Sequence, residues 1–334
     1  MKANRQQLLN QLNQLKPGLA AKELIEQSTC FVFAGGRAYT YNDEIAVSIP
    51  TEIKDIEGAV PAKELVSLLQ KSDNDDVDLE MTDAGLVIKS GRYKSTLSVQ
   101  SEIRLPINEI QTPDKWQALP GKFIEAVKFC LFSVGKDMTK PLLTCIHCFD
   151  TYAESCDRFR LTSYYYEGLM TDSILIPGNA AQELCSFAPT HYAILNGWLH
   201  FKCKDALFSC RTYANAEYPD LSPFLQMPEK CASLSFPTDM QSVLDRAGVF
   251  SETQIKNDNV VSVRVSENKM LVTASGDKGR YEEPIRIRYA GEPIQFEISP
   301  TILSEMLKLG NGVSVTDDKI KFECEDFVHV ISLT

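Results

Sequence analysis

The stretch VPAKELVSLL (residues 60–69), running into VDLEMTDAGLVIKSGRYKSTLSV (77–99), is the first of three that share one pattern. Each consists of a short helix opened near a proline and then three strands. The other two are IPGNAAQELCSF (176–187) into YAILNGWLHFKCKDALFSCRTYA (192–214), and ISPTILSEML (298–307) into VSVTDDKIKFECEDFVHVISLT (313–334). We expect each helix to start just after its proline, where a missing N–H costs nothing. The prolines are Pro61, Pro177 and Pro300.

The strand triplets can be superposed with Ile88, Phe201 and Phe322 in register. The spacing is roughly 115–120 residues, which is the length of a domain rather than of a solenoid repeat. An earlier helix accompanies each copy, at residues 4–15, 121–133 and 238–250. The sequence therefore predicts an α+β fold of three similar domains, each with two helices packed on antiparallel sheets. Proline-containing connectors near Ile107–Pro113 and Pro223–Glu229 give the boundaries 1–112, 113–228 and 229–334.

The composition is that of an ordinary globular protein, with 44% hydrophobic and 24% charged residues in 334. No apolar run is long enough to span a bilayer, and the first thirty residues lack a signal-peptide core. We therefore expect a cytoplasmic protein without a membrane partner. Ten cysteines in a long chain of this kind are expected to be reduced and structural, in apolar settings such as those of Cys30, Cys130, Cys185 and Cys324.

A net charge of −11 argues at first against nucleic-acid binding. The charge is unevenly distributed, however. The candidate helices and their flanks carry about +5, so the rest of the chain carries about −16. Basic residues recur from Lys2 to Lys22, among Asn and Gln, and again from Gly121 to Pro141. Either these helices face a nucleic acid, or the stretch 2–22 is a Gln-rich helix face exposed to solvent.

No catalytic motif is recognisable: there is no P-loop, G-x-S-x-G, H-E-x-x-H or G-x-G-x-x-G. The segment CIHC (145–148) has C-x2-C spacing, but strand alternation puts Cys145 and His147 on one face and Cys148 on the other. The pair Glu282–Glu283 before Pro284 is interpreted as a charged turn. We predict a protein that is not an enzyme and has no metal or cofactor; a zinc enzyme using Cys145–Cys156 is the alternative.

Several segments, in this order, resemble the bacterial β sliding clamp, the processivity subunit of DNA polymerase III. CDRFRL (156–161) resembles that family's T-D-G-H-R-L, and AEYPDLSPFLQMP (216–228) resembles its G-x-F-P-D-Y…P connector. DRAGVFSE (245–252), RYEEPIRIRYAGEPIQFEIS (280–299) and the first-domain segment GAVPAKELVSLL also match. Each match is loose, and their shared order over nearly the whole chain is the specific signal.

The resemblance implies a head-to-tail homodimeric ring that encircles double-stranded DNA without reading its sequence. It also implies a DNA polymerase and an ATP-driven clamp loader as partners. Helices line the hole of such a ring, and its outer sheets continue across the subunit boundary. The candidate DNA-facing residues are Arg5, Lys22, Lys136 and Lys140. The third domain is expected to contribute least, because its first helix has Asp239 and Asp245 against Arg246.

By position in the family, Val249 and Phe250 correspond to apolar residues of the dimer seam, and Leu105 and Ile107 to their partners. Alternatively, all four are core residues. If they form the seam, Phe250→Asp lowers the dimer fraction without unfolding the monomer.

The family also captures short linear motifs in a pocket between its second and third domains. The corresponding wall here is Arg158, Phe159, Arg160, Leu161, Pro228, Val328, Val330 and Ile331. Arg158 and Phe159 replace the family's Gly and His, and ISLT replaces its M-P-M/L-R ending. A bulky Arg in place of Gly is expected to narrow this pocket or change its polarity. The alternative function is a clamp-like protein-interaction module that does not encircle DNA.

Overall fold

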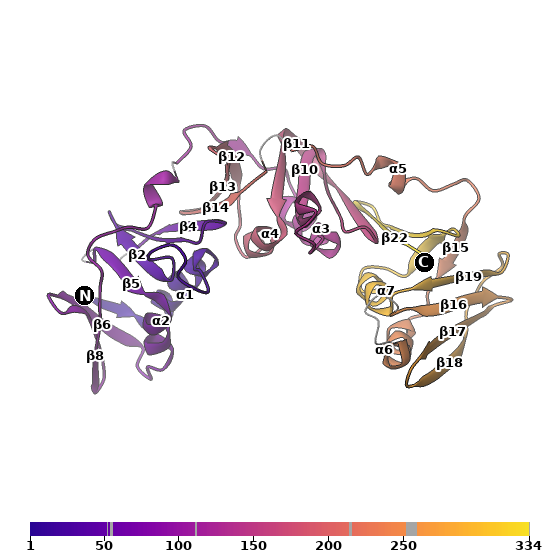
Figure 1. Cartoon of the computed structure of the whole chain (residues 1–334), viewed down its shortest axis with the longest axis horizontal. Helices are drawn as coiled ribbons and strands as arrows, with labels where there is room; N and C mark the ends of the chain where they lie inside the picture. Colours follow the sequence, from indigo (N-terminus) through magenta and orange to yellow (C-terminus); the bar gives the residue numbers. More distant parts are fainter. Residues whose placement is uncertain (52, 54–55, 111, 214–215, 252–258, 334) are drawn as a thin grey trace. The chain divides into compact units, whose positions relative to one another are not determined.

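A computed structural model describes residues 1–334 except 52, 54–55, 111, 214–215, 252–258 and 334 (Figure 1). The chain divides into two compact units. Unit 1 comprises Met1–Leu131, Cys145–Thr151 and Glu167–Ala216, and unit 2 comprises Phe132–Thr144, Tyr152–Tyr166 and Glu217–Thr334. The predicted second domain is shared between the units, and the division into three domains stays a prediction. Gln111 of the first predicted connector, Ala214 and Thr334 at the ends of the second and third repeated segments, and Glu252 of the family-like segment lie outside the described residues.

Unit 1 contains two antiparallel sheets. One has the order β1 (Lys2–Asn4), β6 (Asp76–Thr82), β7 (Gly85–Ser90), β8 (Tyr93–Leu97). The other has the order β5 (Gly58–Pro61), β2 (Cys30–Ala34), β3 (Arg37–Tyr41), β4 (Ile45–Pro50), β14 (Ala206–Arg211), β13 (Trp198–Cys203), β12 (His191–Leu195), β9 (Gln117–Ala118). In this larger sheet β4 pairs with β14, so a strand of the first predicted domain continues the sheet of the second.

Two further sheets have most of their strands in unit 2. One has the order β10 (Cys145–Cys156), β11 (Arg160–Pro177), β22 (Phe327–Ser332), β21 (Lys319–Glu323), β20 (Gly312–Val315), β15 (Ala232–Ser235). The other has the order β18 (Gly279–Arg286), β17 (Lys269–Gly276), β16 (Val261–Ser266), β19 (Ile294–Ile298). The pairing of β11 with β22 repeats in unit 2 what β4 and β14 do in unit 1.

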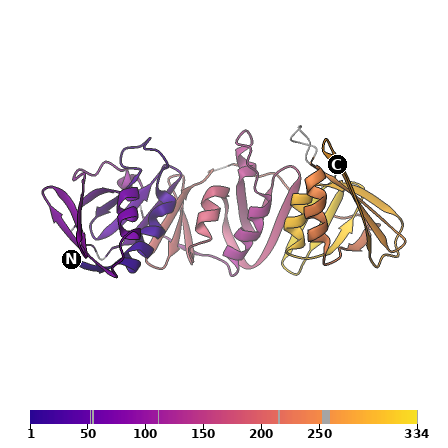
Figure 2. The ribbon, with the colours of Figure 1, turned by 90° about the horizontal axis from the view of Figure 1, so that it is seen from below.

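The six predicted helices are present, and they pack in pairs (Figure 2). They are α1 (Arg5–Leu15) with α2 (Ala62–Gln70), α3 (Phe123–Cys130) with α4 (Gly178–Leu184), and α6 (Met240–Ser251) with α7 (Pro300–Leu307). A short α5 (Ser222–Leu225) lies in the second connector. Pro61 and Pro177 lie immediately before their helices as predicted, whereas Pro300 is the first residue of α7. No described helix has the length and apolarity to cross a bilayer.

The repeat is confirmed at the level of single positions. Ile88, Phe201 and Phe322 are each the fourth residue of the middle strand of their triplet, in β7, β13 and β21. All three are buried, at 0%, 0% and 2% exposure. Each also pairs with a residue on both neighbouring strands. The same position therefore anchors the core of each copy, as the pattern of the sequence predicted.

Two local predictions were wrong, and one alternative does not hold over its full length. Glu282 and Glu283 lie within β18 rather than in a turn, and Pro284 is accommodated because β18 is an edge strand, where a missing donor is tolerated. Cys324 is exposed, because it follows the last residue of β21. The alternative of a helix face over 2–22 does not hold as far as Lys22, because α1 ends at Leu15, in agreement with the predicted helix 4–15, and Pro17 then leaves only the 3-10 turn η1 (Lys16–Gly18).

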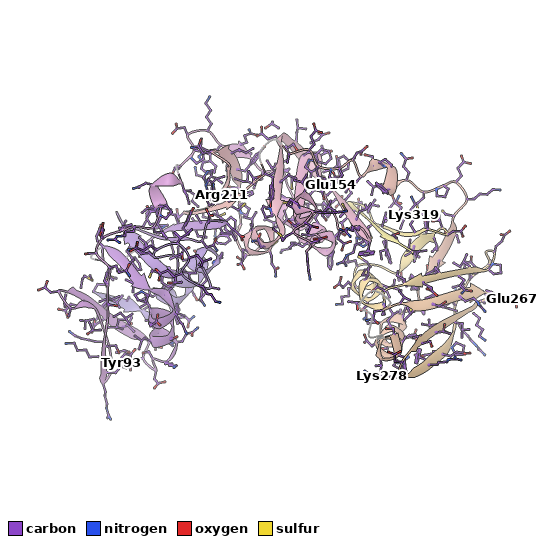
Figure 3. All side chains as sticks on the ribbon, in the orientation of Figure 1. Tyr93, Glu154, Arg211, Glu267, Lys278 and Lys319 are labelled. Atoms are coloured by element: carbon purple, nitrogen blue, oxygen red, sulfur yellow. The ribbon has the colours of Figure 1, made fainter. Side chains whose placement is uncertain are left out.

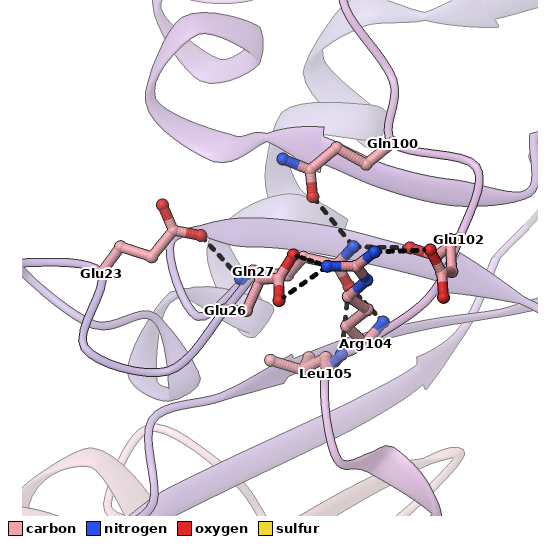
Figure 4. Close-up of polar contacts among 7 residues, drawn as sticks. All are labelled: Glu23, Glu26, Gln27, Gln100, Glu102, Arg104 and Leu105. Atoms are coloured by element: carbon pink, nitrogen blue, oxygen red, sulfur yellow. Dashed lines mark hydrogen bonds and ion pairs between the residues drawn. The ribbon is translucent and has the colours of Figure 1, made fainter.

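A buried glutamine fixes the chain between β8 and the first connector (Figure 4). Gln27 is 1% exposed and adopts a left-handed backbone conformation, with φ of 66°. Its Nε2 donates to Gln100 Oε1 (2.9 Å) and to the carbonyl of Glu102 (2.7 Å). Its Oε1 accepts from the backbone N–H groups of Arg104 (2.8 Å) and Leu105 (3.1 Å). One side chain thus holds residues 100–105 against the sheet.

Candidate functional site: an apolar cavity in unit 2

The hairpin between β10 and β11 is shaped by an aspartate at its first position. Asp157 Oδ1 accepts from the N–H groups of Phe159 and Arg160, both at 3.0 Å. The backbone N–H of Asp157 donates to the Arg160 carbonyl at 3.1 Å. Such Asx turns close tightly and tolerate a left-handed residue, and Arg158 has φ of 92°. The turn leaves Phe159 58% exposed.

Next to this hairpin lies a cavity of about 460 Å³, within the usual size range of ligand pockets. Its floor is mostly apolar, and every lining residue belongs to unit 2. The hairpin, the connector and the ends of β21 and β22 supply the walls. The lining residues are Leu143, Cys156, Arg158, Phe159, Arg160, Leu161, Pro219, Leu221, Phe224, Asp318, Lys319, Val330, Ser332 and Leu333. Leu161, Leu221 and Val330 are themselves buried and pack as one cluster.

The cations at the cavity differ in how far they are already bound. Arg160 is paired with Asp157 (3.0 Å) and Glu305 (2.7 Å), and its side chain is 16% exposed. Lys319 donates to the carbonyls of Phe224 and Gln226 in the connector (Figure 3). Arg158 is paired with Asp137 at 2.9 Å, and both side chains are about half exposed. Arg160 and Lys319 therefore brace the walls, and Arg158 lies at the rim.

A thiol and a phenol lie at the connector side of the cavity. The Tyr218 hydroxyl is 3.9 Å from Cys156 Sγ. Burial raises the pKa of the Cys156 thiol, and burial likewise raises that of Tyr218. Both groups are therefore neutral near pH 7, and Cys156 contributes an apolar surface rather than a nucleophile.

An arginine occupies the corresponding corner of unit 1, and the repeat explains why. The hairpin between β3 and β4 is built in the same way: Asn42 Oδ1 accepts from the backbone N–H groups of Glu44 and Ile45, and Asp43 has φ of 74°. Where β21 and β22 have Lys319 opposite Ser332, β13 and β14 have Trp198 opposite Arg211. The Arg211 guanidinium stacks 4.3 Å from the Trp198 ring centre and pairs with Asp43 at 2.9 Å. Small Ser332 leaves open in unit 2 the space that Arg211 occupies in unit 1.

The predicted pocket wall is brought together in part. Arg158, Phe159, Arg160, Leu161 and Val330 line the cavity. Three predicted residues do not line the cavity. Ile331 points to the opposite face of β22 from Val330 and is 1% exposed, and Val328 packs against the cluster that contains Leu161. Pro228 is an exposed residue beyond α5. Comparison of the repeats would have indicated Lys319 and Ser332, because they align with Trp198 and Arg211. Nothing in the sequence indicated Leu143, which reaches the cavity from the turn η4 (Pro141–Thr144).

The candidate DNA-facing residues lie in different settings. Lys136 and Lys140 are exposed in the loop between η3 (Leu131–Ser133) and η4, and Lys22 is exposed in a bend after α1. Arg5, the first residue of α1, is partly buried and donates to the carbonyls of Asn74 (2.9 Å) and Leu69 (3.4 Å). Its guanidinium therefore satisfies one carbonyl in the last turn of α2 and one in the loop that follows this helix. On α6, Arg246 is held by both carboxylate oxygens of Glu283.

The candidate seam residues fall into two classes. Val249 is 61% exposed near the end of α6, and Phe250 stacks on Tyr281 with ring centres 6.1 Å apart. Leu105 is 3% exposed in the core of unit 1, and Ile107 packs partly buried against the core cluster that contains Leu105.

The described residues contain no group of three His, Cys, Asp or Glu side chains placed to hold a metal ion. In CIHC, Cys145 and Cys148 are both fully buried.

Comparison with known proteins agrees with this architecture. No family model matches the chain. A curated relative, the "Beta sliding clamp" of Synechococcus elongatus, is 24% identical over 296 residues, which is 82% of this chain and 76% of the relative. The DNA polymerase III beta chain of Streptococcus pneumoniae superposes with a TM-score of 0.85 at 17% identity, covering 100% of this chain and 98% of that one. A DnaN sliding clamp of Bartonella birtlesii bound to griselimycin gives 0.86 at 15% identity, with the same coverage. Over its full length the chain has the fold of the bacterial DNA polymerase sliding clamps, and in sequence it resembles the β sliding clamp as a divergent relative.

Proposed function

We propose that this protein is a DNA polymerase processivity factor: a non-enzymatic, cytoplasmic sliding clamp that closes as a homodimeric ring around duplex DNA. An ATP-driven loader would open it, and a polymerase would be tethered to it. The observation that carries the proposal is the likeness to sliding clamps along the whole chain, with TM-scores of 0.80 to 0.86. The threefold repeat supports it independently, because two copies of such a chain supply six similar domains.

DNA would be held through its backbone rather than read. Exposed Lys22, Lys136 and Lys140, together with the amide-rich polar face of α1, suit sequence-independent phosphate contacts that permit sliding. Arg5 would contribute less than these lysines, because its guanidinium already serves two backbone carbonyls. The acidic remainder of the chain would disfavour binding elsewhere on the surface.

Two unpaired strand edges support closure with a second copy. Within the described sheets, β8 pairs only with β7, and β18 pairs only with β17. Edges of this kind are normally covered or paired. Val249 and Phe250 lie near β18, since Phe250 stacks on Tyr281 of that strand. We propose that these residues of one copy meet the Leu105–Ile107 segment of the other, with Ile107 at the surface and Leu105 behind it.

The cavity of unit 2 would receive a linear peptide of a polymerase or loader. Its apolar floor and its volume of about 460 Å³ suit one or two large apolar side chains. Exposed Phe159 and Phe224 at its walls would gain burial when a peptide binds.

Retention on DNA of different topology tests the ring. The protein would be loaded with a bacterial clamp loader and ATP onto nicked circular DNA, passed through a gel-filtration column, and then exposed to a restriction enzyme that linearises the circle. We expect comigration with the circle and release on linearisation, because a ring held only by topology slides off an end. Equal retention on both forms would indicate ordinary DNA binding. Absence from both, with a folded protein, would favour a clamp-like interaction module.

A charge-reversal pair serves as the matched variant. Lys136→Glu with Lys140→Glu should weaken retention on circular DNA as salt rises, since each lost phosphate contact lowers the salt-dependent affinity. Lys230→Glu, an exposed lysine in the connector region of unit 2, is the control and should behave as wild type.

A further inference from the structure

We infer that Arg158 makes the unit 2 cavity selective for peptides that carry an acidic side chain beside their apolar residues, and that Asp137 of the same chain holds Arg158 until such a peptide replaces it. The inference rests on the proposed role of the cavity as a peptide site and names the class of peptide it takes. It concerns one ion pair, Arg158–Asp137, at the cavity rim.

The backbone keeps Arg158 at the rim. Asp157 fixes the turn by accepting from the two N–H groups that follow Arg158. Arg158 itself has φ of 92°, a region that side-chain-bearing residues rarely adopt, so the turn around it defines its position. Its side chain lines the cavity and is 50% exposed, which leaves the guanidinium accessible both to the cavity and to Asp137.

Charge at the cavity favours an acidic ligand, and Arg158 is the cation suited to receive it. Asp318 is the one acid among the lining residues, against Arg158, Arg160 and Lys319. Arg160 is committed to two carboxylates and largely buried, and Lys319 is committed to two connector carbonyls. A guanidinium presents several N–H groups in a planar fork that fits a carboxylate, and Arg158 donates to Asp137 through Nη2.

Asp137 can release Arg158 without being left unsatisfied. Its Oδ1 accepts from the backbone N–H of Thr139 at 3.0 Å and from Thr139 Oγ1 at 2.7 Å, and only Oδ2 faces Arg158. The pKa of Asp137 lies below its ordinary value chiefly because of these Thr139 bonds. The ion pair is about half exposed on both sides, and pairs of this kind are weak and easily exchanged. Asp137 therefore competes with an acidic peptide without blocking it.

The test uses two blocked, fluorescein-labelled peptides, Asp-Ala-Leu-Leu-Phe-Ala-Asp and Ser-Ala-Leu-Leu-Phe-Ala-Ser, titrated with the full chain and followed by fluorescence anisotropy. We expect the acidic peptide to bind about three- to tenfold more tightly than the neutral one. Arg158→Gln should remove this preference and leave the neutral peptide unchanged. Asp137→Asn should strengthen binding of the acidic peptide about two- to fivefold, because the competing carboxylate is gone. Phe224→Asp, at an exposed wall position, should weaken both peptides.

The opposite signs expected for the two halves of one ion pair make the outcome decisive. The inference is overturned if the acidic preference survives Arg158→Gln, or if Asp137→Asn leaves or weakens binding of the acidic peptide. A result in which both peptides bind equally, with binding sensitive to Phe224→Asp, keeps the peptide site and rejects the selectivity. Failure of both peptides to bind rejects the peptide site itself, and the DNA-retention experiment then judges the ring separately.

Discussion

Gln27 is a buried amide whose side chain makes four hydrogen bonds to one segment of unit 1, residues 100–105 (Figure 4). Replacing it with alanine leaves two N–H groups without their partner, that of Leu105 in a buried setting and that of Arg104 in a partly buried one. Each such group costs about 1–3 kcal/mol, so Gln27→Ala should lower the free energy of unfolding by about 2–4 kcal/mol. Arg104→Ala is the control: its pairs with Glu26 and Glu102 are half exposed, so the loss should stay below about 1 kcal/mol. Urea titration of both variants measures the difference, and equal effects would contradict the assignment.

His200 should make unit 1 sensitive to mild acid. Burial lowers its pKa from 6.5 to about 4, and its Nδ1 is 2.8 Å from Ser209 Oγ. Below pH 6.5 the unfolded chain binds a proton at this residue that the folded chain does not. Stability is therefore lost as pH falls from 6.5 toward 4, by about 1.4 kcal/mol per pH unit. Both tryptophans, Trp116 and Trp198, belong to unit 1, so urea titrations followed by tryptophan fluorescence at pH 6.5 and 5.0 report on it. His200→Gln should flatten this dependence; an unchanged slope would rule His200 out as its source.

At the scale of elements, the helices were predictable because their signals are local. Leu8, Leu12 and Leu15 on one face, with Asn4 capping the N–H of Gln7, specify α1 without reference to the rest of the fold. The strand triplets were predictable for a different reason: three copies of one pattern carry more information than one. The errors arose where tertiary position overrides local preference, as for Pro284, which is a turn residue in most settings but is tolerated in an edge strand.

The cavity could be predicted only in part, because it depends on what opposes each residue across a strand pair. CDRFRL indicated the hairpin wall by resemblance. The space itself exists because Ser332 is small and Lys319 turns to the connector, a fact of register that the sequence alone does not display. Arg211 and Trp198 fill the equivalent corner of unit 1. This contrast explains why this corner is open in one copy and occupied by an arginine in another. A cavity of about 330 Å³ in unit 1 is lined by other residues, among them Tyr41, Ala46 and Ser209.

The same contrast gives a prediction for β22. Ser332→Arg should fill the cavity as Arg211 fills its counterpart, and should weaken binding of both labelled heptapeptides at least about tenfold, about 1.4 kcal/mol. Because position 332 is exposed at the strand end, the free energy of unfolding should change by no more than about 0.5 kcal/mol. Ser332→Ala is the control and should bind as wild type. Normal peptide affinity in a folded Ser332→Arg variant would show that the cavity does not take the peptide.

At the scale of the whole molecule, the proposal requires two copies, and Val249 offers the cleanest way to test this. It is 61% exposed on α6, so Val249→Asp removes no core contact, whereas Phe250→Asp would also lose its stacking on Tyr281. Burying an unpaired carboxylate in an apolar seam is costly, and we expect the dimer dissociation constant to rise at least about thirtyfold, about 2 kcal/mol. Analytical ultracentrifugation across micromolar concentrations measures this. Leu24→Asp, at a 93% exposed leucine of unit 1, is the matched control and should leave the mass unchanged.

In the ring model, loss of the dimer should also abolish retention on circular DNA. If closure holds the protein on DNA, Val249→Asp should lose retention on circular DNA in proportion to the lost dimer, while the labelled heptapeptides bind as before, because every residue lining their cavity belongs to one unit of one chain. Leu24→Asp should keep both properties. A monomeric Val249→Asp protein that stays on circular DNA would separate DNA binding from ring closure and refute the topological mechanism. Loss of peptide binding together with the dimer would instead mean that the cavity requires the second copy.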